Sequence, residues 1–145
     1  MSSSTVVLLL VTAAVLPNLD GFVPENPAFK TTYGDGVCFM VYWHSHGPIV
    51  SYYAKCPSWS PGVTVSAKLN LTEGPMNTFA LTADETNRKN YESFIKEARE
   101  SCQKSPKLEI GDTEKITHKL GPKGETLEAS IGLIKRIFSP GFCPT

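Results

Sequence analysis

The sequence carries no excess of charge of either sign, because 14 Asp and Glu residues match its 14 Lys and Arg residues. Bulk electrostatic attraction to nucleic acid, to heparin or to an anionic membrane is therefore not expected. The sequence also has no apolar run of the roughly 18–20 residues that a membrane-spanning helix needs, and no internal repeat or low-complexity tract. A chain of 145 residues with this composition predicts a single compact domain.

Motifs that carry catalytic or cofactor chemistry are missing as well. The sequence has no G-x-S-x-G turn for a serine nucleophile, no phosphate-binding loop and no G-x-G-x-x-G dinucleotide motif. Its cysteines lack the C-x-x-C spacing that is typical of zinc sites and redox centres. We therefore expect no cofactor and no resident metal, and the pattern favours a non-enzymatic protein.

The N-terminus is typical of a secretory signal peptide. The uncharged run VVLLLVTAAVL at Val6–Leu16 has the length of a signal-peptide core, and Pro17 ends it. No Lys or Arg precedes the run, which departs from the usual pattern, and a buried strand or helix at the start of the fold is the alternative. We interpret residues 1–21 as a signal peptide and residues 22–145 as one secreted, extracellular domain.

The cysteines fit an oxidising compartment, where an even number predicts disulfide bonds. They are Cys38, Cys56, Cys102 and Cys143. A hairpin centred on Gly47 would place Cys38 opposite Cys56, which favours that bridge and leaves Cys102 to pair with Cys143. The sequence alone allows three connectivities. Asn70-Leu71-Thr72 is an acceptor motif for N-glycosylation in an exported chain.

Alternation of apolar and polar residues predicts several strands, and a 3.6-residue period predicts one helix. The strands are expected at 37–43, 49–56, 63–72, 78–82 and 115–120, with a short strand-like run at 108–110, and residues 22–36 are read as an irregular arm. The helix is expected over 84–104, with Asp84 or Thr86 as its cap and one apolar stripe of Tyr91, Phe94, Ile95, Ala98 and Cys102. Residues 125–138 fit either a strand or a helix, and the preceding turn favours a strand.

Six aromatic residues within 21 positions form the candidate ligand-binding set. Aromatic side chains dominate binding pockets and interfaces, although plain core packing is the alternative. The set is Phe39, Tyr42, Trp43, Tyr52, Tyr53 and Trp59.

Three histidines provide a second hypothesis. His44 and His46 are two residues apart, so on a strand both rings could face one metal ion, with His118 as a third ligand. The alternative is a turn with two solvated histidines and a half-buried His118 on an apolar strand face.

Together these patterns predict an α+β fold, with an antiparallel sheet of about six strands packed on one long amphipathic helix and stabilised by disulfides. The function we expect is that of a secreted binding protein, which engages an apolar small molecule or an extracellular protein through the aromatic hairpin. The alternative is a small secreted hydrolase that uses His44, His46 and His118.

Overall fold

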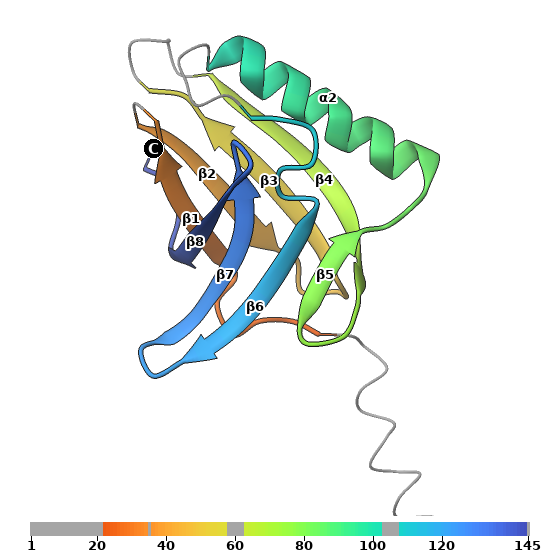
Figure 1. The fold of residues 1–145 in the computed structure, drawn as a ribbon, viewed down its shortest axis with the longest axis vertical. Helices are drawn as coiled ribbons and strands as arrows, with labels where there is room; N and C mark the ends of the chain where they lie inside the picture. Colours follow the sequence, from red (N-terminus) through yellow and green to blue (C-terminus); the bar gives the residue numbers. More distant parts are fainter. Residues whose placement is uncertain (1–21, 35, 58–62, 103–107, 145) are drawn as a thin grey trace, which may run out of the picture.

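The computed structural model describes residues 22–34, 36–57, 63–102 and 108–144, and shows a β-barrel with one helix beside it (Figure 1). The elements, in chain order, are β1 (Ala28–Tyr33), β2 (Val37–Trp43), β3 (Ile49–Lys55), β4 (Thr64–Glu73), β5 (Thr78–Leu81), α2 (Glu85–Ser101), β6 (Lys115–Gly121), β7 (Gly124–Ile131) and β8 (Ile134–Pro140).

The sheet is a closed antiparallel barrel in which each strand pairs with its neighbours in chain order. Pairing of β1 with β8, at Phe29 with Pro140 and Lys30 with Ser139, completes the ring. The expectation of an open sheet of about six strands packed on a long helix is therefore wrong, whereas the predominance of antiparallel strands, the single helix in the described residues and the two disulfides are confirmed.

Two strands escaped the sequence pattern. β1 lies inside the segment that was read as an irregular arm, where Pro27 and Gly34 border it closely. The segment 125–138 is not one strand but belongs to two, because Gly132 and Leu133 both take positive φ angles, 62° and 63°, and form the tight turn between β7 and β8. These two additions raise six expected strands to eight.

The barrel interior is packed with side chains from alternate positions of the strands, as the two-residue period requires. Among the largest fully buried residues of the strands are Phe29, Phe39, Tyr52, Leu69, Phe79, Ile116, Leu127 and Phe138. The helix adds its apolar stripe to the same core, with Tyr91, Phe94, Ile95 and Ala98 buried and Cys102 following. Burial of this stripe confirms the predicted amphipathic helix.

Helix α2 follows β5 in the chain, after the pairing of β5 with β4 has ended at Leu81. Asp84 caps it by accepting a hydrogen bond from the backbone N–H of Asn87 at 2.8 Å. The side-chain amide of Asn87 then bonds both the N–H and the carbonyl of Asn70, and also the carbonyl of Thr82. The amide thereby satisfies the backbone groups of Asn70 at the edge of β4, just beyond the point where β5 stops pairing with β4.

A loop at residues 108–114 covers the end of the barrel where β7 turns into β8. The fully buried Asp112 carboxylate accepts hydrogen bonds from the backbone N–H groups of Glu109 and Gly132, at 2.7 Å each, and of Leu133 at 2.9 Å. From the core, the hydroxyl of Tyr52 donates to the carbonyl of Thr113, and the hydroxyl of Tyr91 donates to that of Asp112. Leu108 and Ile110, expected as a short strand, lie in this loop instead.

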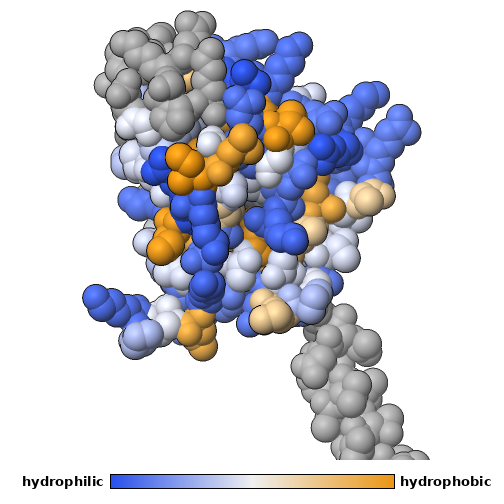
Figure 2. All heavy atoms as spheres, in the orientation of Figure 1, coloured by the Kyte–Doolittle hydropathy of each residue, from blue (hydrophilic) through white to orange (hydrophobic). Residues whose placement is uncertain are grey.

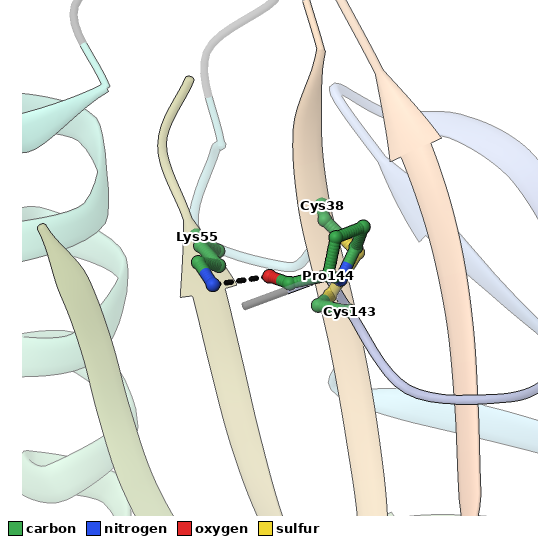
Figure 3. The surroundings of a disulfide bond; sticks show 4 residues. All are labelled: Cys38, Lys55, Cys143 and Pro144. Carbon is green, nitrogen blue, oxygen red and sulfur yellow. Dashed lines mark hydrogen bonds between the residues drawn. A yellow bond between two sulfur atoms is a disulfide. The ribbon is translucent and has the colours of Figure 1, made fainter. Parts of the chain in front are cut away.

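The disulfides join Cys38 to Cys143 and Cys56 to Cys102, so the favoured pairing of Cys38 with Cys56 is wrong. The reason is a shift of one residue in the hairpin: Cys38 faces Lys55, not Cys56. Because a shift of one residue moves a side chain to the opposite face, the two cysteines point apart. Figure 3 shows the Cys38–Cys143 bridge on β2, with Lys55 of β3 donating to the carbonyl of Pro144 beside it.

We predict that replacing Asp112 by Ala destabilises the fold by about 3 kcal/mol or more, because three buried N–H groups lose their acceptor. Urea unfolding at neutral pH measures the change. The matched control is Glu73→Ala at an exposed position of β4, which should change stability by no more than about 0.5 kcal/mol. A loss below about 1 kcal/mol for Asp112→Ala would contradict the anchoring role.

Candidate binding surfaces

The hairpin of β2 and β3 divides the predicted aromatic set between two sides of the barrel wall. Phe39, Trp43 and Tyr52 point inward and are at most 2% exposed. Tyr42 and Tyr53 lie at outward positions of the same strands and are half-buried. Trp59 lies outside the described residues. The structure therefore does not bring the five described residues together on one surface.

The inward rings pack against each other in the core. The Phe39 ring contacts the rings of Tyr52, Phe94 and Phe138 at centroid distances of 5.3, 5.6 and 5.7 Å. These edge-on contacts join β2, β3, the helix and β8 through one side chain. Burial raises the pKa of Tyr52, so its hydroxyl stays a neutral donor to the carbonyl of Thr113.

The outward positions of the same strands form a surface that we call the basic–aromatic face, defined by Lys30, Met40, Tyr42, Tyr53, Lys55 and Lys68. Strand register makes it continuous, since Met40 pairs with Lys30 on one side and with Tyr53 on the other. Ser51 pairs in the same way with Tyr42 and Lys68. The C-terminal tail lies across part of this face: Phe142 contacts Tyr42 at a ring distance of 6.5 Å, Cys143 is bonded to Cys38, and the carbonyl of Pro144 accepts a hydrogen bond from Lys55.

The charge on this face is of one sign. The only carboxylate in the described strands β1–β4 is Glu73, the last residue of β4. Lys30, Lys55 and Lys68 take part in none of the ion pairs of the described residues. Those pairs all lie in the second half of the chain: Arg88 with Glu92 and Glu114, Arg99 with Glu109, His118 with Glu125, and Glu128 with Lys119 and Lys135.

The three histidines have separate surroundings. His44 Nε2 shares a hydrogen bond of 2.8 Å with the hydroxyl of Ser51, and burial and the nearby Lys68 lower the pKa of His44. His46 is exposed in the turn between β2 and β3. His118 lies on the inner side of β6, is 8% exposed and bonds Glu125. No group of three or more side chains suited to hold a metal ion occurs in the part of the chain that is described.

Phe22 packs against the end of the barrel opposite the β7–β8 turn. Its ring lies 5.9 Å from the ring of Trp43, 5.2 Å from that of Phe79 and 4.8 Å from that of His118. We call the side chains of Trp43, Phe79 and His118, which surround the Phe22 ring, the Phe22 site. Figure 1 shows the segment that carries Phe22 crossing the lower end of the barrel beneath β6 before it enters β1.

The carboxylate of Glu125 holds the same segment in place. One of its oxygens accepts from the N–H and the side-chain amide of Asn26, both at 2.7 Å, and the other accepts from the N–H of Glu25 at 3.0 Å and bonds His118 at 2.7 Å. Burial opposes ionisation of this carboxyl, but its hydrogen bonds from His118, Asn26 and Glu25 outweigh burial and lower its pKa.

Sequence reasoning missed Phe22, Phe79 and Glu125 as site residues. A signal for Glu125 was present, because it precedes Leu127, Ala129 and Ile131 at the same inward parity of one strand. An acid at an inward position needs a partner, and His118 at an inward position of the adjacent strand is that partner. Phe22 gave no such signal, because its neighbours are distant in sequence.

Exposed apolar residues gather elsewhere. Figure 2 shows hydrophobic residues around the β7–β8 turn, where Ile110, Leu133 and Ile134 are exposed. A shallow groove of about 610 Å³ lies over the outer side of β6, β7 and β8, and Ile137 and Pro122 contribute to its apolar lining. Two of its charged lining residues, Glu128 and Lys119, bond each other, and Glu128 also bonds Lys135.

Searches of protein-family models, curated proteins and solved structures returned no match to this chain. Within the described residues, none of the helical structure is long and apolar enough to cross a membrane. The molecular features that bear on function are therefore the two disulfides, the buried aromatic cluster, the basic–aromatic face and the Phe22 site.

We predict that core and surface aromatics of the hairpin differ sharply in their contribution to stability. Phe39→Ala should lower the free energy of unfolding by about 3–5 kcal/mol, because it leaves a cavity among the three rings that it contacts. Tyr53→Ala should lower it by less than about 1.5 kcal/mol, because its side chain is only half-buried. Chemical denaturation of both variants tests this, and equal losses would show that the outer tyrosine is part of the core.

We predict that Glu125 makes stability depend on pH in the acid range. Its pKa is lower in the folded chain than in the unfolded chain, so its contribution is present above the ordinary carboxyl pKa and is lost as pH falls through the lowered value. Unfolding free energies from pH 7 to pH 3 should fall less steeply for Glu125→Gln than for the wild type. Glu73→Gln, at an exposed position, should keep the wild-type profile, and an unchanged profile for Glu125→Gln would refute the assignment.

Proposed function

We propose that this chain is a secreted, non-enzymatic binding protein that docks an acidic segment of an extracellular protein on the basic–aromatic face. The single observation that carries the proposal is a four-strand sheet surface that presents three lysines and two tyrosines with no carboxylate among them. Two disulfides and a barrel core of buried aromatics are compatible with a protein of this class in an oxidising compartment.

The outer side of the hairpin is favoured over its inner side by packing. Phe39 and Tyr52, two members of the predicted aromatic set, contact each other and are fully buried. A ligand could reach them only by displacing the core. Tyr42 and Tyr53 are accessible in part without any such rearrangement, and tyrosine is among the residues most enriched at binding hot spots.

Charge complementarity supports an acidic partner. Lys68 is exposed, and Lys30 and Lys55 are half-buried, yet no carboxylate neutralises them in the described structure. Lys55 donates to the Pro144 carbonyl, which engages one of its protons without supplying an opposite charge. A partner with clustered Asp and Glu would meet complementary potential here, which raises association rates and fixes orientation.

The face also has the anatomy of a protein interface. Met40 and Tyr53 form a cross-strand pair with Lys30 beside it, Tyr42 lies two residues along β2 next to Phe142, and Lys55 and Lys68 lie in the neighbouring rows. Interfaces commonly combine an aromatic and methionine-rich centre with a charged rim. An extended acidic segment that includes aromatic residues would satisfy both parts of the surface.

The experiment measures binding of the purified protein to an immobilised copolymer of Glu and Tyr as the acidic polypeptide probe. We expect salt-sensitive binding, about tenfold weaker in the double variant Lys30→Glu/Lys68→Glu. The matched control is Lys89→Glu/Lys96→Glu on the exposed side of the helix, which changes the net charge equally and should bind as the wild type does. Tyr53→Ser should weaken binding without removing its dependence on salt.

Three outcomes would overturn the proposal. One is the absence of binding at low ionic strength, and a second is an equal loss in the helix control, which would indicate bulk charge only. The third is tighter binding to heparin than to the copolymer, with the same lysine dependence, because the partner would then be a sulfated polysaccharide and not an acidic protein.

A further inference from the structure

We propose that the Phe22 site is a binding site for a small arylalkylamine, and that the chain's own segment 22–26 is a built-in competitor for it. The Phe22 site is separate from the basic–aromatic face, since it lies on the inner side of the barrel wall. Three features meet there, at one end of the barrel: an aromatic cluster, a buried carboxylate and a buried indole donor without a partner among the described residues.

The aromatic cluster can bind one aromatic ring. Phe22 meets Trp43 and His118 edge-on, with interplanar angles of 86° and 62°, and meets Phe79 at a tilt of 34°. The rings of Trp43 and Phe79 also contact each other at 5.0 Å, so this contact does not depend on Phe22. Phe22 itself is only half-buried, at the outer end of the cluster. A phenyl-sized ring from a ligand can make the same contacts.

The buried carboxylate supplies the charge that selects an amine. Glu125 is 6% exposed and forms four hydrogen bonds, three of them with the segment and one with His118. Withdrawal of the segment leaves this carboxylate with His118 as its one remaining partner of the four. A buried anion in that position strongly favours a cation with several N–H donors. A protonated primary amine has three such donors.

The unpaired donor is the indole N–H of Trp43. Trp43 is 2% exposed, and its Nε1 has no hydrogen-bond partner among the residues that the structure describes, whereas nearly all buried polar atoms in proteins have one. A cluster that served only as core would be expected to satisfy this group or to use Phe instead. A hydroxyl oxygen on the ligand ring would give the indole its acceptor, which favours a hydroxylated arylalkylamine over the unsubstituted one.

The segment can act as a competitor because little else retains it. Between Phe22 and Pro27, side-chain contacts with the barrel are the Phe22 ring contacts and the burial of Pro24. The hydrogen bonds are three to Glu125 and one from the backbone N–H of Trp43 to the carbonyl of Pro27. Val23 and Glu25 are exposed. Segments with few buried contacts open at low cost, and a ligand's apparent affinity is reduced by the fraction of time that such a segment occupies the site.

The test is calorimetric binding of tyramine and phenethylamine to the purified protein, with 2-phenylethanol and 3-phenylpropionate as neutral and anionic analogues of the same ring size. We expect tyramine to bind more tightly than phenethylamine, phenethylamine more tightly than 2-phenylethanol, and phenylpropionate not at all. Phe22→Ala should tighten tyramine binding by roughly tenfold, because it removes the competing ring. Phe142→Ala, which changes an exposed aromatic residue on the C-terminal tail, should leave tyramine binding unchanged.

A second variant separates the charge from the ring. Glu125→Gln should abolish the preference for phenethylamine over 2-phenylethanol, and if that variant does not fold, the comparison of the four probes on the wild type still decides. Equal binding of amine and alcohol by the wild-type protein would overturn the proposal, as would tyramine affinity that Phe22→Ala leaves unchanged or weakens. Copolymer binding by the same Phe22→Ala variant reports separately on the basic–aromatic face, so the two proposals can fail independently.

Discussion

Closure of the sheet by β1 and β8 is the constraint on which the other features of this protein depend. Once Phe29 pairs with Pro140, the eight strands of the described chain form a ring, and alternate residues must point either into the ring or out of it. The interior of an eight-stranded barrel is just wide enough for side chains to fill. Phe39, Tyr52 and Phe138 do so here, and the helix contributes Phe94 to the same cluster.

A filled interior directs binding chemistry to the outside and to the ends. On the outside, the lysines of the first four strands have no carboxylate partner among the described residues, whereas several charged residues of the second half form ion pairs with each other. At one end, burial of Glu125 carries a desolvation penalty that four hydrogen bonds offset. The segment that supplies three of those bonds thereby closes the end of the barrel. At the other end, the buried Asp112 carboxylate accepts hydrogen bonds from the 108–114 loop and from the β7–β8 turn, and so joins the two.

Periodicity predicted the elements in which neighbours along the chain determine the pattern. The helix, its Asp84 cap and its apolar stripe were all predicted, as were the strands around residues 37–43, 49–56 and 63–72. The hairpin of the first two carries apolar residues on both of its faces, which favours cover on each. Its inner face is indeed covered by the barrel core, and the C-terminal tail covers part of the outer face, through Phe142 and Cys143. β1 was missed because Pro27 and Gly34 resemble an irregular segment, although Phe29 and Tyr33 alternate inward.

The amino-acid sequence by itself determined the local periods, the balance of charge, the concentration of aromatics between positions 39 and 59 and the even number of cysteines. Tertiary structure alone decided the closure of the barrel, the partner of each cysteine and the meeting of Phe22 with Trp43, Phe79 and His118. The physical reason is separation along the chain. Glu125 bonds residues 99 and 100 positions away, and Cys38 bonds a cysteine 105 positions away. A shift of one residue in a single hairpin is enough to exchange the two faces on which such partners lie.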